Sequence, residues 1–253
     1  MSLRIERIPP AATLALRVLL REEVNRQIVH DSIHRREGWT HTYGISLDGE
    51  SVGFASVAVA GPWTDRPTVI EFYLLPEHRP RAFEAFEEFL RVSGATHFEA
   101  QTNESLYPTL VLAYGRELFT EKIIFETGPA TALLSGGATL RRVTPPEEIH
   151  AAIERRQGGG EWILELEGSA IGKGGVLFHY NRPYGDVYME IEKPYRRRGF
   201  GSYFVQELRR ACFDFGAIPA ARCNADNVAS RRTLQRAGFL PVASIICGAI
   251  TPP

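Results

Sequence analysis

The sequence predicts an α/β fold that is built twice, as two tandem domains that each hold a mixed, mostly antiparallel sheet flanked by helices. A length of 253 residues suits two small domains. The order helix, three strands, helix, strand, helix, strand occurs twice along the chain. A segment rich in glycine and other small residues, 128–139, separates the two runs. The predicted domains are therefore residues 1–136 and 137–253.

The first run of elements begins with residues 11–36, whose apolar residues recur at the spacing of one or two amphipathic helices. Two apolar runs follow and are joined by Gly49-Glu50, which is a turn signal and predicts a hairpin. The hairpin strands are expected at 42–48 and 51–60. The elements expected after the hairpin are a strand at 68–75, a helix at 80–92, a strand at 97–102, a helix at about 105–117 and a strand at 121–127.

The second run begins with an additional strand at 139–143 and then repeats this order. Pro145 and Pro146 open a helix, which ends at the glycines 158–160 because proline favours helix starts and glycine favours helix ends. Gly168-Ser169 is the turn of a second hairpin. The strands of this hairpin are expected at 161–167 and 170–179, and the later elements are a strand at 185–192, a helix at 199–215, a strand at 218–223, a helix at 227–237 and a strand at 239–247.

The composition excludes several classes of protein. A net charge of -1 excludes a general nucleic-acid coat and a polybasic membrane binder. No apolar stretch approaches the roughly 18 residues of a membrane helix, and the N-terminus lacks the features of a signal peptide. The chain has three cysteines, which are Cys212, Cys223 and Cys247. This number is small and odd, so a disulfide framework is not expected. We therefore expect a cytoplasmic protein with no nucleic-acid partner and no membrane partner.

The charge is distributed unevenly between the two predicted domains. From residue 137 onward there are 16 Lys and Arg against 12 Asp and Glu, a formal charge of +4, which leaves -5 for residues 1–136. Either the second domain alone holds an anionic ligand or the asymmetry is chance.

Residues 185–204, GDVYMEIEKPYRRRGFGSYF, form the segment with the clearest chemical signal. A strand ends at Pro194-Tyr195, and three arginines, Gly199, Phe200 and Gly201 precede a helix. Backbone N–H groups at a glycine-rich helix start, aided by arginine side chains, form an anion site that suits phosphate. The alternative is a solvated run of arginines before an ordinary helix.

Three kinds of phosphate-binding loop can be compared with this segment. No Walker A string occurs in the chain, and a dinucleotide fingerprint would need a third glycine where Phe204 stands. The string Arg196-x-x-Gly199-x-Gly201 resembles the acyl-CoA pyrophosphate signature of the GNAT N-acetyltransferase superfamily. Asn227-x-x-Ser230, followed by a helix that ends in Gly238-Phe239, resembles its second signature. The resemblance covers about residues 137–250.

The resemblance implies that acetyl-CoA is the co-substrate and that the strand at 187–192 diverges from the strand at 218–223 to admit pantetheine. The backbone of residues 198–202 would hold the pyrophosphate, and the N–H near Ile191 would bind pantetheine or polarise the thioester carbonyl. Arg231 and Arg232 either reach the adenosine phosphates or lie on a solvated helix face. The expected cofactor-binding residues are Ile191, Glu192, Arg196, Arg197, Arg198, Gly199, Phe200, Gly201, Ser202, Asn227 and Ser230.

The expected chemistry is direct transfer of an acyl group from a thioester to an amine, so a group must take the proton of the ammonium form. Asp186, Tyr188, Glu190 and Glu192 alternate onto one face of the strand. We expect Glu190 to be the base and keep Tyr188 as a second catalytic candidate; the alternative is an exposed strand face that carries acids. Leu234 stands where many family members have the tyrosine that protonates the thiolate. Water, Tyr188 or the other domain could replace that tyrosine, or no acid is needed.

The first domain is interpreted as a degenerate GNAT-like domain that lacks the CoA pyrophosphate loop. Its equivalent segment, 76–83, has no glycine, and Pro80 removes a backbone donor. This domain could shape the acceptor pocket or mediate self-association, so a homodimer stays open. The tandem arrangement is similar to two-domain GNAT enzymes such as mycothiol synthase.

One group of histidines and one cysteine are further candidate sites. His30, Asp31, His34 and His41 could suggest a metal site, but no third ligand has fixed spacing, so a polar helix end is the favoured interpretation and no metal is expected. Cys223 could carry an acyl group, although a packed strand cysteine is the default.

The function predicted from these observations is a CoA-dependent N-acetyltransferase, with the active site in the second domain and a small-molecule or peptide amine as acceptor. The alternative from another class is a non-catalytic acyl-CoA-binding or sensing protein, which the missing tyrosine favours. A third hypothesis is a different nucleotide-binding enzyme, which binding of NAD in place of CoA would support.

Overall fold

The computed structural model describes residues 2–251, and the contacts between these residues divide the chain into two compact units. Unit 1 contains the chain up to Glu121 together with the segment from Ser244 onward. Unit 2 is Lys122–Ala243. These units are defined by contacts and not by chain order, and the domain boundary at 136/137 stays a prediction.

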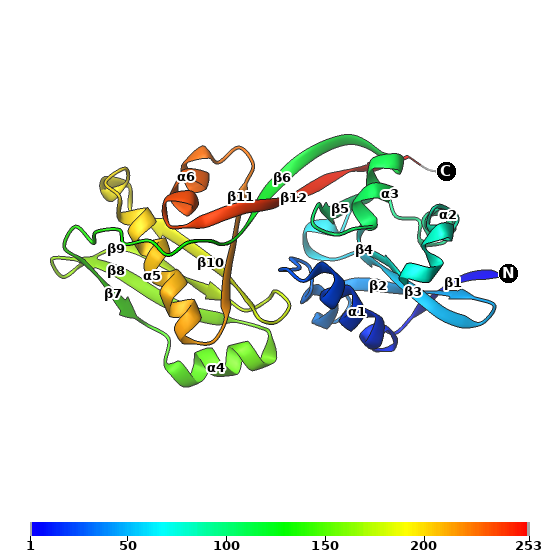
Figure 1. The fold of residues 1–253 in the computed structure, drawn as a ribbon, viewed down its shortest axis with the longest axis horizontal. Coiled ribbons are helices and arrows are strands. Elements are labelled where there is room, and N and C mark those ends of the chain that lie inside the picture. Colours follow the sequence, from blue (N-terminus) through cyan, green and yellow to red (C-terminus); the bar gives the residue numbers. More distant parts are fainter. Residues whose placement is uncertain (1, 252–253) are drawn as a thin grey trace. The chain divides into compact units, whose positions relative to one another are not determined.

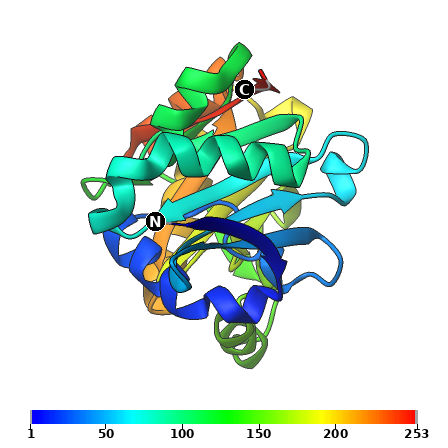
Figure 2. The same cartoon turned by 90° about the vertical axis from the view of Figure 1, so that its right-hand side faces the viewer.

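Unit 1 is a mixed sheet covered by helices (Figures 1 and 2). Its strands lie in the order β1 (Leu3–Ile8), β2 (Thr40–Leu47), β3 (Glu50–Ala58), β4 (Thr68–Leu74) and β5 (His97–Gln101), followed by the end of β12 (Phe239–Ile250). All neighbours are antiparallel except β4 and β5, which are parallel. The helices are α1 (Leu14–Val24), α2 (Ala82–Ser93) and α3 (Tyr107–Tyr114).

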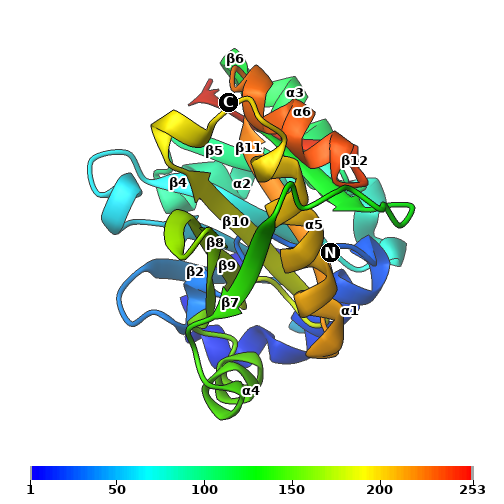
Figure 3. The same ribbon diagram turned by 90° about the vertical axis from the view of Figure 1, so that its left-hand side faces the viewer.

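Unit 2 repeats this design, and Figure 3 shows α5 lying across its strands. Its strands lie in the order β7 (Ala138–Arg142), β8 (Gly159–Leu166), β9 (Ser169–Leu177), β10 (Tyr184–Ile191) and β11 (Ile218–Asn224), followed by the end of β6 (Gly115–Thr127). Only β10 and β11 are parallel among these neighbours. The helices are α4 (Pro146–Arg155), α5 (Phe200–Asp214) and α6 (Val228–Arg236).

The predicted fold class, a twice-repeated α/β arrangement with mostly antiparallel sheets, is confirmed, but several local predictions were wrong. The strand β1 was not predicted. The expected helix at 11–36 is reduced to α1, because Asn25 adopts a left-handed conformation that ends the helix. Short 3-10 helices occupy Pro10–Thr13, Ile33–Arg35, Gly61–Trp63, Pro76–Arg81 and Lys193–Tyr195. None of the helices described in residues 2–251 is long and apolar enough to cross a membrane.

The last strand of each half of the chain completes the sheet of the other half's unit. Residues Lys122 to Glu126 of β6 pair with β11, which belongs to the second run of elements. Residues Ile245 to Ala249 of β12 pair with β5, which belongs to the first run. The apolar pattern predicts both strands, but it carries no information on which distant strand each will pair with.

The predicted linker at 128–139 packs against unit 2, where two buried polar residues of α5 hold it. Gln206 accepts hydrogen bonds from the Thr131 hydroxyl (2.8 Å) and from the backbone N–H of Leu133 (2.7 Å). Arg209 donates to the Thr127 hydroxyl (2.7 Å) and to the Pro129 carbonyl (2.8 Å). These bonds satisfy backbone groups that a Gly-rich segment would otherwise leave to water.

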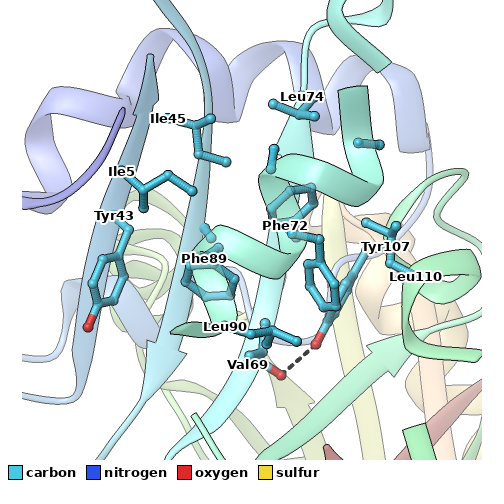
Figure 4. Packing of buried hydrophobic residues seen from close by; sticks show 14 of the residues in the cluster. Ile5, Tyr43, Ile45, Val69, Phe72, Leu74, Phe89, Leu90, Tyr107 and Leu110 are labelled. Carbon is cyan, nitrogen blue, oxygen red and sulfur yellow. Dashed lines mark hydrogen bonds between the residues drawn. The ribbon is translucent and has the colours of Figure 1, made fainter. Parts of the chain in front are cut away.

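The core of unit 1 is aromatic and lies between the sheet and α2. Phe72 of β4 packs on Phe86 and Phe89 of α2, with ring centroids 5.0 and 5.9 Å apart. Figure 4 shows Phe72, Phe89 and Tyr107 among the core residues, and the hydroxyl of Tyr107 donates to the carbonyl of Val69. In unit 2, the fully buried side chains of Phe204 and Leu208 join α5 to the sheet. Both helices therefore bury one apolar face, as the predicted periodicity requires.

Candidate functional site

The parallel strands β10 and β11 separate part-way along their length. Their paired residues run from Tyr184 opposite Ile218 to Asp186 opposite Ala220. Beyond Asp186, β10 continues to Ile191 beside β9, and β11 continues beside β6. We call this divergence the C-terminal split. It lies where the sequence predicted that the two strands would diverge.

The split leaves backbone groups of β10 facing the edge that β11 has left. Glu192 donates its N–H to Ile171 of β9 (2.9 Å), which is the opposite edge. Because consecutive residues of a strand direct their N–H groups to alternate edges, the N–H groups of Met189 and Ile191 point toward the split. The predicted donor Ile191 is therefore oriented into the split, whereas the backbone N–H of Glu192 is used by the sheet.

The loop between β10 and α5 turns through left-handed backbone conformations at Arg197 (φ 62°) and Gly199 (φ 91°). Gly199 is the N-cap of α5, and the first helical N–H with an intrahelical partner is that of Tyr203, which donates to Gly199 (3.1 Å). The N–H groups of Phe200, Gly201 and Ser202 thus have no acceptor within the helix. Three donors at the positive end of the helix dipole form a site for an anion.

A groove of about 700 Å³ joins this loop, the end of β10 and the start of α6. We call it the donor groove. Nine of the predicted site residues line it: Glu190, Ile191, Arg196, Arg197, Gly199, Gly201, Ser202, Asn227 and Ser230. Its lining also includes Met189, Ala229, Arg232, Thr233 and Arg236. Arg236 was not predicted, although its position four residues after Arg232 on the same helix places both guanidiniums on one face.

Glu192, Arg198 and Phe200 do not line the donor groove among the described residues. The Arg198 guanidinium stacks on the ring of Phe200, 5.1 Å from its centroid, and the Phe200 side chain is buried. Arg196 lines the groove but also donates through Nε to the carbonyl of Ile191 (2.7 Å). Of the three consecutive arginines, Arg196 therefore holds the loop against β10, and Arg198 packs on the loop's aromatic residues.

The second signature has a clear structural basis at both ends of α6. The Asn227 side chain is the N-cap and accepts a hydrogen bond from the backbone N–H of Ser230 (3.0 Å). Gly238 adopts a left-handed conformation (φ 87°) directly after the helix. A Cβ at Gly238 would lie 2.4 Å from the carbonyl oxygen of Pro129, so only glycine fits there. The signature therefore fixes the helix whose first turn borders the groove.

A second cavity of about 330 Å³ in unit 2 adjoins the donor groove, because Met189, Ser230 and Thr233 line both. We call it the inner pocket. Tyr188 and Leu234 line the inner pocket, as does Cys223. Burial raises the pKa of the Cys223 thiol, so the thiolate needed for acyl attachment is disfavoured. Burial, with the charge of Glu161, also raises the pKa of Tyr188.

The row of acids on β10 is divided between these two spaces. Glu190 lies at the donor groove, largely exposed, and pairs with Arg196 (3.4 Å). Asp186 lies at the inner pocket, is buried, and pairs with His179 (3.2 Å) and Arg222 (3.5 Å). The contacts of Asp186 could not be read from the sequence, because His179 and Arg222 come from other parts of the chain.

Unit 1 contains an equivalent divergence, since β4 and β5 pair only at Thr68 opposite His97 and at Val69 opposite Phe98. We call it the N-terminal split. The chain itself fills it. The Tyr107 hydroxyl donates to the Val69 carbonyl (2.7 Å), as Figure 4 shows. The Gln101 side chain donates to the backbone carbonyl of Gln27 (3.0 Å) and accepts from the backbone N–H of Val29.

The loop before α2 differs from the loop before α5 in the same way. Residues Pro76–Arg81 form a 3-10 helix, in which His78 donates its N–H to Leu75 (2.9 Å) and Ala82 donates to Arg79. No residue of this loop has a left-handed backbone conformation, because no positive φ occurs between Gly61 and Gly94. The amides that would bind a phosphate are therefore partly used within the loop itself.

His30 and His34 of unit 1 contact buried carboxylates and do not lie at a polar helix end as the sequence suggested. His30 contacts Glu99 (3.1 Å), and His34 contacts Glu71 (2.9 Å), which also pairs with Arg17 (2.6 Å). The one group of metal-type ligands found in the described part of the chain is a different one, Glu99, Glu121 and Cys247. The Cys247 thiol donates a hydrogen bond to the Glu121 carboxylate, with 3.8 Å between Sγ and Oε2.

Comparisons with known proteins agree with this geometry. Residues 133–239 match the acetyltransferase (GNAT) family model. No curated protein matches the sequence. Among solved structures, the chain is similar to a GNAT-family acetyltransferase from Colwellia psychrerythraea, with 16% identity, a TM-score of 0.74 and coverage of 98% of this chain and 100% of that chain.

Two further solved structures share the fold over their full length. A tandem GNAT protein from the clavulanic acid biosynthesis pathway has 13% identity and a TM-score of 0.65, with 100% of both chains covered. A GCN5-related N-acetyltransferase from Sphaerobacter thermophilus has 15% identity and a TM-score of 0.60, with 99% of this chain and 96% of that chain covered. At these identities the likeness concerns the fold alone. The family match concerns residues 133–239, and the chain as a whole shares its fold with GNAT acetyltransferases, a tandem GNAT protein among them.

Proposed function

We propose that the protein is a CoA-dependent N-acetyltransferase whose active site is the C-terminal split. The observation that carries this proposal is the donor groove, which brings the helix-start amides of α5 together with the open edge of β10. Acetyl-CoA would lie with its pyrophosphate at residues 199–202 and its pantetheine arm along Met189 and Ile191. Arg232 and Arg236 would face the adenosine phosphates.

The reaction follows from the two adjoining spaces. An acceptor amine in the inner pocket would reach the thioester through the region of Met189, Ser230 and Thr233. The ammonium first gives one proton to a base, for which Glu190 stays our prediction, with Tyr188 as the second candidate. The nitrogen lone pair then attacks the carbonyl carbon, the carbon–sulfur bond breaks, and CoA leaves as the thiolate. The second proton of the nitrogen is released as the amide forms and is taken up by the thiolate, directly or through water. A fixed N–H at Ile191 would stabilise the oxyanion.

One observation favours a second function, binding or sensing of acyl-CoA without turnover. Leu234 lies at the inner pocket, where many family members have the tyrosine that protonates the thiolate. This alternative predicts acetyl-CoA binding with no transfer to any amine. The cytoplasmic location, the amine acceptor, the absence of nucleic-acid and membrane partners, and a homodimer stay predictions from the sequence.

Calorimetric titration with acetyl-CoA, CoA and NAD tests the proposal. We expect one acetyl-CoA site per chain and no binding of NAD. The variant Gly201→Asp places a carboxylate at the helix start, where an added Cβ would lie 3.3 Å from the flexible end of the Met189 side chain, which has to shift slightly. It should weaken CoA binding by about 100-fold and leave folding nearly unchanged. Unchanged affinity in this variant would remove the donor groove as the CoA site.

A further inference from the structure

The inner pocket carries charges of both signs within one small space. Asp186 of β10, Arg222 of β11 and Lys122 of β6 all line it, together with the polar side chains of Tyr188 and Asn224. These residues come from three neighbouring strands of unit 2. The pocket is thus not a simple acidic site for a cation.

The position of the Asp186 carboxylate is fixed by its contacts. It is buried at the last residue of β10 that pairs with β11. Arg222 contacts it through Nε (3.5 Å), and His179 contacts it through Nε2 (3.2 Å). The Arg222 guanidinium also lies 3.5 Å from His179 through Nη2. Both a carboxylate and a guanidinium are therefore held at the pocket by the same small network.

The volume of the pocket limits its occupant. At about 330 Å³ it is at the small end of ligand pockets, and it opens toward the donor groove at Met189, Ser230 and Thr233. A small molecule fits this space with its reacting nitrogen near the thioester. The size and the paired charges together select the chemical class of the acceptor.

We propose that the acceptor is a small molecule with a carboxylate beside its amine, an amino acid in chemical terms. Arg222 and Lys122 bind the carboxylate, and Asp186 and Tyr188 face the amine. Charge complementarity of this kind rejects polyamines, which would meet two cations, and it discriminates against simple alkylamines, which offer no carboxylate to Arg222 and Lys122. This inference rests on the proposed acetyltransferase function.

The test compares amino acids with the amines that lack only the carboxylate, such as norvaline with butylamine. The readouts are release of the CoA thiol from acetyl-CoA and calorimetric binding of each probe to the protein–CoA complex. We expect norvaline, or another amino acid of a panel, to be preferred over its matched amine by about 10- to 100-fold, the range of a charge-assisted contact. Titration of acetyl-CoA alone is run in parallel.

Three variants test which residues cause the preference for amino acids over their matched amines. Arg222→Gln and Lys122→Gln should each reduce the amino-acid preference, and the second keeps the test valid if the first fails to fold. Asp186→Asn should weaken amino acids and amines alike, because it removes the partner of the ammonium and not of the carboxylate. Arg141→Gln, on an exposed residue of β7 paired with Glu165, is the matched control and should keep the preference.

The outcomes separate this inference from the proposed function. Acetyl-CoA binding with equal use of amines and amino acids, or with neither bound, overturns the inference and leaves the CoA site in place. A preference that survives in both Arg222→Gln and Lys122→Gln also overturns it. Failure of acetyl-CoA to bind overturns the proposed function and the inference together.

Discussion

The N-terminal split and the C-terminal split have the same strand geometry but opposite contents. In both, two parallel strands pair at their first residues and then diverge. In the N-terminal split, the residues past the paired part of β4 and β5 are buried and form hydrogen bonds with other residues of the chain; they are Glu71, Glu99 and Gln101. Beyond the C-terminal pairs, Tyr188 and Glu190 are exposed beside two cavities. We infer that a split can bind a ligand only where the chain leaves it unfilled.

The loops that precede α2 and α5 differ in a corresponding way. The loop before α5 needs left-handed residues, which glycine supplies at Gly199, and it ends with free helix-start donors. The loop before α2 contains Pro76 and Pro80 and is wound as a 3-10 helix. The difference between an anion site and a structural turn therefore lies in a few residues at equivalent positions of one repeated fold.

The largest effect is expected from Glu71→Gln, which breaks the buried ion pairs that fill the N-terminal split. Burial would raise the pKa of Glu71, but the charges of Arg17 and His34 outweigh it and lower the pKa to about 2. The substitution leaves Arg17 buried without a carboxylate and should cost about 3–5 kcal/mol of unfolding free energy. Urea unfolding followed by tryptophan fluorescence measures this loss, since Trp39 and Trp63 lie in unit 1.

The same pair predicts a dependence on pH. Because the pKa of Glu71 is lower in the folded protein, its contribution is complete above about pH 4.5 and is lost as the pH falls toward about 2. The Glu71→Gln variant should lack this part of the acid transition. Glu165→Gln, which breaks an exposed pair with Arg141, is the control and should cost less than about 1 kcal/mol. Equal losses in the two variants would contradict a structural role for the filled split.

Glu190→Gln tests whether the open C-terminal split contains the base of the proposed reaction. If Glu190 accepts the ammonium proton, kcat should fall by about 100-fold while acetyl-CoA affinity is kept. Asp214→Asn, an exposed carboxylate at the end of α5, is the control and should change neither. Wild-type turnover in Glu190→Gln would remove this residue as the base and would leave Asp186 and Tyr188 as the acidic groups of the split.

Tyr107→Phe removes one hydroxyl from the filled split. The buried carbonyl of Val69 then loses its donor, which should cost about 1–3 kcal/mol. Tyr188→Phe in the open split, where the side chain is part-exposed, should cost less than about 0.5 kcal/mol. Calorimetry of Tyr107→Phe should still give one acetyl-CoA site per chain. A second site would mean that one hydroxyl alone keeps the N-terminal split closed.

The smallest effect is expected from Glu104→Gln. Burial, followed by the charges of Glu71 and Glu23, raises the pKa of Glu104 well above its ordinary value. A carboxyl whose pKa is raised on folding makes the protein less stable as the pH rises above the unfolded value. The variant should therefore gain stability at pH 7, on the order of 1 kcal/mol, and little at pH 4. A stability loss at pH 7 would show that the carboxyl has a favourable partner.

The repeated element order, the loop before α5 and the two ends of α6 could be predicted because each depends on residues close together in the sequence. Gly199 and Gly201 mark the helix start, Asn227 is an N-cap, and Gly238 ends α6. These are local conformational preferences, so short patterns contain them. Nine predicted residues meet in the donor groove for the same reason.

Tertiary structure alone decided which strands exchange partners, what fills the N-terminal split and which charges meet in the inner pocket. The pairing of β6 with β11 and of β12 with β5 joins residues about 100 or more positions apart. The contact of Arg222 with Asp186 depends on where β10 and β11 separate. Local patterns do not contain such contacts, because they arise when distant segments bury their surfaces together. The sequence thus determined the elements and the loop before α5, and the packing within each unit determined which split stayed open.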